Sequence, residues 1–160
     1  MLPNVTKILF ATDMNDNQRG VLSYAIDLAR RFDAQLTLMH VLEPMGQFTH
    51  AIVEDHVSAD TLARIHDEGI TRVSKRMQQE IEACIRDEFG GDQALAQRIK
   101  VQVEEGRPAE LILKQANASD VDLIVLGGHG HSTIGEILLG STAHRITQRS
   151  QVPVLLIPVG

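Results

Sequence analysis

Five glycines, two histidines and two Ser-Thr pairs gather in one stretch, GGHGHSTIGEILLGST, at residues 127–142. Glycine lets the backbone adopt positive φ values and approach a ligand closely. Gly140 and Ser141 stand before an expected helix, whose N-terminus would offer free N–H groups and partial positive charge to an anion. The stretch therefore suits a phosphate-binding loop, although a turn followed by a helix cap would use similar residues.

The spacing of these residues excludes two common phosphate-binding motifs. A Walker A loop places lysine after its final glycine, whereas here Ser141 follows Gly140 and the stretch contains no lysine. A dinucleotide-binding GxGxxG motif beginning at Gly128 would require glycine at position 133, where the chain has Thr133. A different nucleotide-binding arrangement is needed to account for the stretch.

The histidines raise metal binding as a second chemistry. His129 and His131 are two residues apart, and His144 follows downstream without a neighbouring cysteine. Zinc sites use three or four such ligands, so we do not expect a dedicated metal site. A Mg²⁺ or Mn²⁺ ion carried by the phosphates of a nucleotide fits the residues better.

Phosphoryl transfer makes further demands that the stretch meets poorly. It requires a residue that positions water and groups that stabilise developing negative charge. Between residues 127 and 140, Glu136 is the one carboxylate, and neither Lys nor Arg is present. Glu136 can equally be a solvent-facing helix residue, and Ser141 has no evident base partner. We therefore expect a bound nucleotide to act as a ligand, with hydrolysis slow or absent.

The composition excludes several classes of partner. The chain has 160 residues, a formal net charge of −6 and a sequence pI near 5.6. An acidic surface repels nucleic-acid phosphates and anionic membranes. One tyrosine, four phenylalanines and no tryptophan leave little surface for stacking on single-stranded bases. We therefore expect no nucleic-acid partner.

The chain also lacks the sequence features of export and membrane insertion. The first residues, MLPNVTKILFATD, have no positive segment followed by an apolar core and a cleavage site. No apolar run approaches the roughly 20 residues that span a bilayer. Cys84 is the only cysteine, so no intramolecular disulfide can form, as is usual in a reducing compartment. The expected location is the cytoplasm, without direct membrane insertion.

The elements that would position the glycine-rich stretch alternate between short apolar runs and long amphipathic ones. The apolar runs predict five strands, KILFATD (7–13), QLTLMHVLEP (35–44), RIKVQVEEG (98–106), VDLIVLG (121–127) and VPVLLIPV (152–159). Helical periodicity predicts helices over residues 17–33, 60–89, 107–119 and 141–149. Residues 45–59 are polar and aperiodic, which predicts a mobile surface segment.

Strands separated by helices predict right-handed crossovers and a parallel sheet. The expected fold class is α/β, a three-layer α/β/α arrangement in which residues 1–160 form one domain. Ligands in such sheets bind beyond the carboxyl ends of the strands, where the strand order reverses. Asp13 and Gly127 each stand at such an end, so a site is predicted between them.

The spacing Gly127-x-x-Gly130, nine residues, then Gly140-Ser141 resembles the nucleotide-binding motif of the universal stress protein family, in its ATP-binding branch. The resemblance covers nearly the whole chain. KILFATD and LTLMHVLEP are similar to the first two strands of the family, and EEGRPAELILKQANASDVDLIVLGGHG and LLGSTAHRITQRSQVPVLLIPV are similar to its later segments. The resemblance implies a five-stranded parallel sheet in the order 3-2-1-4-5.

The resemblance also implies a set of ATP-binding residues. Asp13 would contact the adenosine moiety, Val41 would offer backbone groups to adenine, and the glycine-rich stretch would hold ribose and phosphates. His131 lies in the nine-residue span where the family varies. The complete implied set is Thr12, Asp13, Val41, Gly127, Gly130, His131, Gly140, Ser141 and Thr142.

The function implied by the resemblance is that of a small cytoplasmic ATP-binding regulatory protein, in the stress response or in the regulation of a partner such as a transporter. ATP would order the glycine-rich stretch and modulate assembly or partner docking. The alternative is an enzyme of the related adenine-nucleotide α-hydrolase type, which hydrolyses ATP slowly or transfers a nucleotidyl group.

The last strand predicts an assembly. VPVLLIPV lies at a sheet edge in the implied order, and an uncovered apolar edge invites pairing with another chain. A two-fold homodimer would pair two such strands antiparallel within Val152–Ile157, as the resemblance also implies. Two dimers can then meet near the glycine-rich stretches as a homotetramer, with ATP ordering the contact.

Overall fold

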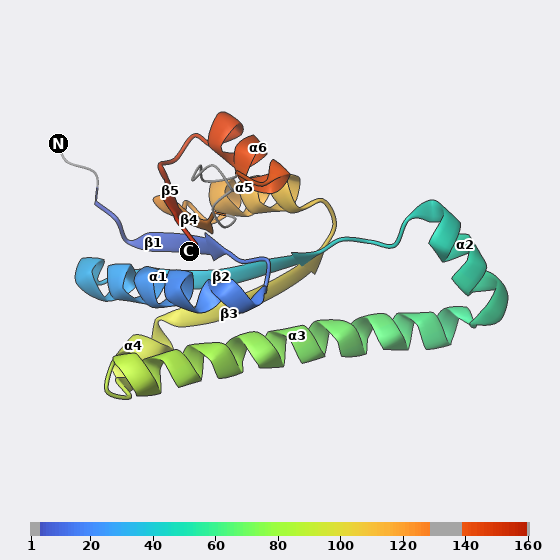
Figure 1. Ribbon diagram of the computed structural model, residues 1–160, viewed down its shortest axis with the longest axis horizontal. Coiled ribbons are helices and arrows are strands. Elements are labelled where there is room, and N and C mark those ends of the chain that lie inside the picture. Colours follow the sequence, from blue (N-terminus) through green and yellow to red (C-terminus); the bar gives the residue numbers. More distant parts are fainter. Residues whose placement is uncertain (1–3, 129–138, 160) are drawn as a thin grey trace.

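Five parallel strands form a sheet in the order β3-β2-β1-β4-β5 in the computed structural model (Figure 1). The structure describes residues 4–128 and 139–159. The strands are β1 (Lys7–Ala11), β2 (Gln35–Leu42), β3 (Ile99–Glu105), β4 (Leu123–Gly127) and β5 (Val154–Ile157). The predicted α/β class and strand order are confirmed, and the order reverses between β1 and β4.

Helices cover both faces of the sheet. The long helices α1 (Arg19–Phe32) and α3 (Ala59–Glu88) lie along one face, and α5 (Pro108–Ala118) and α6 (Ser141–Arg149) lie along the other (Figure 1). A short 3₁₀ helix, η1 (Asp16–Gln18), leads into α1. The predicted three layers are therefore present.

Each face of the sheet has its own core, because successive strand residues point to opposite sides. In β1, Ile8 and Phe10 pack with α1 and α3, whereas Leu9 packs with α5 and α6, and all three are at most 1% exposed. A parallel sheet buried on both faces needs apolar residues at successive positions. This requirement explains the unbroken apolar runs in the sequence.

The ends of the predicted helices coincide with local capping residues. The Ser58 hydroxyl accepts a hydrogen bond from the Thr61 N–H at 3.2 Å, which caps the start of α3. Gly90 and Gly91 follow α3 with φ of 63° and 70°, a conformation that favours glycine. Pro108 occupies the first turn of α5, where its missing N–H costs nothing.

Residues 45–59 lie at the surface, as predicted, but a helix that was not predicted, α2 (Gln47–His56), forms within them. No residue of α2 is buried, and its most apolar side chain, Phe48, is 80% exposed. Helical periodicity in a sequence reflects a buried face, so a helix without one leaves little pattern to detect. The five-residue helix α4 (Gln93–Gln97) was also not predicted, since it is too short to show a period.

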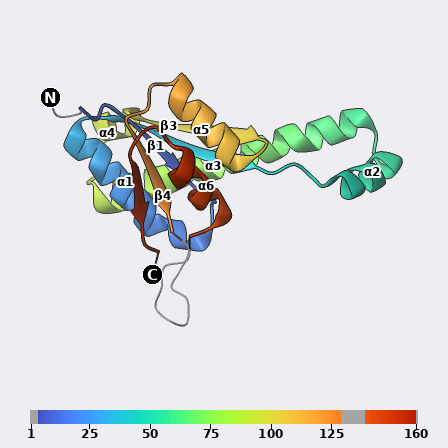
Figure 2. The same cartoon turned by 90° about the horizontal axis from the view of Figure 1, so that it is seen from above.

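Together, α2 and the first half of α3 form an arm that extends beyond the sheet (Figures 1 and 2). The buried residues of α3 all lie in its second half, between Met77 and Ile85, whereas Ile65 in the first half is 54% exposed. His66 contacts the Glu105 carboxylate at the end of β3, and this contact raises the pKa of the imidazole. Among the described residues, no helix is long and apolar enough to cross a membrane.

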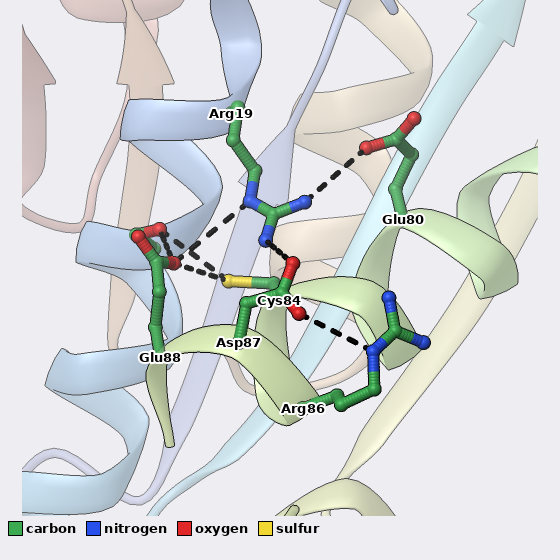
Figure 3. Close-up of polar contacts among 7 residues, drawn as sticks. Arg19, Glu80, Cys84, Arg86, Asp87 and Glu88 are labelled. Carbon is green, nitrogen blue, oxygen red and sulfur yellow. Dashed lines mark hydrogen bonds and ion pairs between the residues drawn. The ribbon is translucent and has the colours of Figure 1, made fainter. Parts of the chain in front are cut away.

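A polar cluster joins α1 to the second half of α3 (Figure 3). The Arg19 guanidinium lies 3.9 Å from Glu80, 3.4 Å from Asp87 and 3.8 Å from Glu88. The Glu88 carboxylate also accepts hydrogen bonds from the Ser23 hydroxyl and, at 3.0 Å, from the Cys84 thiol. Exposed ion pairs contribute little stability individually, so this cluster mainly fixes how the two helices are aligned.

We expect Cys84 to be unreactive in the folded protein. Burial, and then the neighbouring Glu88 carboxylate, raise the pKa of its thiol from 9.0 to about 11, and the thiolate is the reactive form. The higher pKa alone leaves about a hundredfold less thiolate at pH 8. Ellman's reagent should therefore react slowly with the native protein and rapidly in urea. Equal rates in the two conditions would contradict this prediction.

Candidate functional site

A cleft of about 400 Å³ lies where the carboxyl ends of β1, β2 and β4 meet the start of α6. Its size is in the range of small-molecule sites, and its place is the point of strand-order reversal. Gly130 and His131 lie outside the described residues. The other seven predicted binding residues all line the cleft, namely Thr12, Asp13, Val41, Gly127, Gly140, Ser141 and Thr142.

The turn after β1 forms the floor of the cleft. The Thr12 N–H donates to the Met39 carbonyl at 2.9 Å, and the buried Thr12 hydroxyl accepts from the Met14 N–H at 3.1 Å. The exposed Asp13 carboxylate accepts two hydrogen bonds from Asn15, at 3.2 Å from its backbone N–H and at 2.8 Å from its side-chain amide. Asp13 therefore shapes the turn, and it also presents its carboxylate at the cleft.

The wall beside this turn is the exposed edge of β2. Strand β1 pairs with β2 only as far as Ala11↔Met39, whereas β2 continues beside β3 to Leu42↔Glu105. At Val41 the edge of β2 that faces the cleft is therefore not covered by β1. The backbone there is in position to hydrogen-bond a planar group inserted into the cleft.

His40 is a cleft residue that the sequence did not single out. Its Nδ1 lies 2.7 Å from the Thr12 carbonyl oxygen. Because a carbonyl can only accept, Nδ1 carries the hydrogen, and Nε2 of a neutral ring is left as an acceptor. The signal available in the sequence was a histidine within the apolar run LTLMHVL. Its partner, the Thr12 carbonyl after β1, is evident only in the folded structure.

Gly127 permits close packing. A Cβ atom at this position would lie 2.9 Å from Nε2 of Gln18 and 3.2 Å from Cγ2 of Val21. Gln18 also lines the cleft, so the missing side chain lets the start of α1 approach the end of β4. The next N–H, of Gly128, donates to the Ile157 carbonyl at 2.8 Å and keeps β5 beside β4.

The opposite wall is the first turn of α6. Gly140 is the N-cap residue and makes no side-chain cap, and the His144 N–H donates to its carbonyl at 2.9 Å. The preceding N–H groups, of Ser141, Thr142 and Ala143, have no acceptor within an α-helix. These residues line the cleft, so the helix terminus can bind an anion placed there.

A metal site of three protein ligands is not found in the described part of the chain, where no three His, Cys, Asp or Glu side chains come together suitably. His129, His131, Ser132 and Glu136 fall outside residues 4–128 and 139–159, so the hypotheses about them stay predictions.

Comparison with known proteins identifies the family. The model of the universal stress protein family matches residues 4–158. The chain belongs to the universal stress protein family. Universal stress protein YxiE of Bacillus subtilis is 28% identical over 156 residues, covering 94% of this chain and 97% of that protein. Universal stress protein A homolog 2 of Coxiella burnetii is 30% identical over 159 residues, covering 99% and 98%.

Solved structures of the family share the fold. UspA from Lactobacillus plantarum superposes with a TM-score of 0.70 at 24% identity, covering 98% of this chain and 99% of that chain. A universal stress protein in complex with cAMP gives a TM-score of 0.65 at 20% identity, covering 99% and 100%. The Archaeoglobus fulgidus protein in complex with dAMP gives 0.54 at 18% identity, covering 97% and 99%.

The packing at Gly127 yields a stability prediction. Gly127→Ala places a methyl group against the flexible end of Gln18 and against the buried Val21, so we expect a cost at the lower end of the range for overpacking, about 1 kcal/mol. We expect the urea midpoint of unfolding to fall accordingly. Gly69→Ala, in α3, is the matched control, because a Cβ there meets nothing within 4 Å and alanine favours the helix. Equal midpoints for the two variants would argue against the close approach.

Proposed function

We propose that this universal stress protein binds adenine nucleotides, ATP in particular, in the cleft between β1, β2, β4 and α6. The observation that carries the proposal is the convergence of seven predicted binding residues at the strand-order reversal. Two related structures were solved in complex with cAMP and dAMP, which supports an adenine nucleotide as the ligand class.

Each wall of the cleft would bind one part of the ligand. The uncovered backbone edge at Val41 would form hydrogen bonds with adenine, and the Asp13 carboxylate would accept hydrogen bonds from the ribose hydroxyl groups. The first-turn N–H groups of α6 and the hydroxyls of Ser141 and Thr142 would hold phosphate. A Mg²⁺ or Mn²⁺ ion would be carried by the phosphates and water, which needs few protein ligands.

ATP would act in this protein as a regulatory ligand. Its binding at the start of α6 would order the glycine-rich stretch, and the ordered surface would modulate assembly or docking onto a partner such as a transporter. We place this role in the cytoplasm and in the stress response, on the strength of the family. Catalysis is not part of the proposal, since Glu136, the candidate water-positioning residue, lies outside the described residues.

The test is calorimetric titration of the purified protein with ATP and with GTP. We expect ATP to bind at least about tenfold more tightly, a difference of about 1.4 kcal/mol. Adenine presents an amino donor beside a ring acceptor, which matches a strand C=O and N–H, whereas guanine presents a carbonyl acceptor at the same place. Absence of both heat and a thermal shift at millimolar ATP would remove the proposal.

Two variants in the same titration distinguish loss of phosphate binding at the start of α6 from loss of the fold. Gly140→Val adds a β-branched side chain at the cap of α6 and should abolish ATP binding while the circular dichroism spectrum is retained. Ser141→Ala should weaken binding less, because the N–H groups of the first turn remain. Normal ATP binding by Gly140→Val would place the nucleotide elsewhere.

We also propose a homodimer that forms through β5. This strand lies at the sheet edge, and its four residues are half-buried. The Ile124 N–H donates to the Pro153 carbonyl, and the Gly128 N–H to the Ile157 carbonyl. Alternate residues of a strand bond to the same neighbour, so Val154 and Leu156 turn their N–H and C=O groups outward. A second copy of β5 could pair there antiparallel. Two such dimers would give a tetramer.

Val154→Pro tests this pairing directly. Proline removes the outward N–H of Val154 while leaving the hydrogen bonds to β4 in place. We expect a monomer in light scattering at micromolar concentration. Val154→Ala also removes the valine side chain but keeps the backbone N–H, so this control variant should remain a dimer. A dimer that survives the proline substitution would locate the interface on another surface.

A further inference from the structure

A groove with a volume of about 380 Å³ adjoins the nucleotide cleft and contains two arginines from different elements. Arg107 stands before α5, and Arg145 lies in α6. The groove lies directly beside the cleft, because four residues line both, namely Glu43, Pro108, Ser141 and Thr142. A ligand bound at the start of α6 can therefore extend into the groove.

Arg145 is placed to reach such a ligand. It lies four residues after Ser141, so it is one turn further along the same side of α6, roughly 6 Å along the helix axis. Side chains of a helix slant toward its N-terminus, which directs the guanidinium back toward the first turn. Arg145 is exposed, and within residues 4–128 and 139–159 it forms no ion pair.

The other charges of the groove do not satisfy Arg145. The Arg107 guanidinium lies 3.4 Å from the Glu110 carboxylate, and both side chains are more than half exposed, so they form a weak pair. Two carboxylates line the cleft, and both follow strands: Asp13 comes after β1 and Glu43 after β2. Glu43 also lines the groove. The ends of β1 and β2 therefore contribute carboxylates to the cleft, and the arginines of the adjoining groove come from α6 and from the turn before α5.

This distribution of charge would orient a nucleotide and distinguish ligands by their number of phosphates. Carboxylates accept hydrogen bonds from ribose hydroxyls and repel phosphate, whereas guanidinium groups bind phosphate oxygens in pairs. We propose that Arg145, with Arg107 beside it in the groove, holds the terminal phosphates of a nucleoside triphosphate and makes the protein select triphosphates over monophosphates and cyclic monophosphates. The inference rests on the nucleotide-binding function proposed above.

Titration of the full chain with AMP, cAMP, ADP and ATP tests this selection. The wild-type protein should bind ATP at least about tenfold more tightly than AMP or cAMP, since a charge-assisted contact is added. Arg145→Gln should weaken ATP about tenfold and leave AMP and cAMP within about twofold. Arg107→Gln should act in the same direction with a smaller effect, because Glu110 already competes for that guanidinium.

Arg149→Gln is the matched control, because Arg149 is an exposed arginine in the last turn of the same helix and does not line the groove. It should bind all four nucleotides like the wild type. Equal weakening of AMP and ATP by Arg145→Gln, or no weakening of ATP, would overturn the selection by Arg145 while leaving nucleotide binding intact. If none of the four binds to the wild type, the proposed function itself fails.

Discussion

The termination of β1 is the constraint on which the cleft depends. The hydrogen bonds of β1 to β2 end with the Thr12 N–H, although β2 continues to Leu42. Beyond that point the polar groups of the chain are satisfied locally. His40 donates a hydrogen bond to the Thr12 carbonyl, and the Thr12 hydroxyl accepts one from the Met14 N–H. One more pair of strand residues would fill the space that now separates the backbone of Val41 from α6.

Much of the fold could be predicted from the sequence, because buried faces impose a period on the residues that form them. The helix expected at residues 60–89 spans Ala59–Glu88, and the helix expected at residues 141–149 is found with those bounds. The limit of this logic appears within α3. Ala63 and Ile81 lie 18 residues apart, which is five full turns, and so share one side of the helix, yet Ala63 is exposed and Ile81 is only 1% exposed. The sequence does not show where a helix passes the end of its sheet.

The candidate site was partly predictable for a different reason. The glycine spacing and the residues at strand ends identified positions that the fold brings together, because carboxyl ends of parallel strands share one edge. His40 and Gln18 could not be found in this way, since each matters only through a neighbour distant in the chain, Thr12 for His40 and Gly127 for Gln18. The groove arginines likewise lie outside the glycine-rich stretch, since they come from α6 and from the turn before α5.

The two halves of α3 differ in how they are held, and we expect them to open as two separate cooperative units. Its second half is anchored by Met77, Ile81, Cys84 and Ile85, whose backbone amides should exchange with solvent only when the domain unfolds. The first half buries none of its residues and contains Gly69, which weakens a helix interior. Its amides can exchange through local fraying, so the arm belongs to the part of the molecule that opens at low free-energy cost while the sheet stays intact.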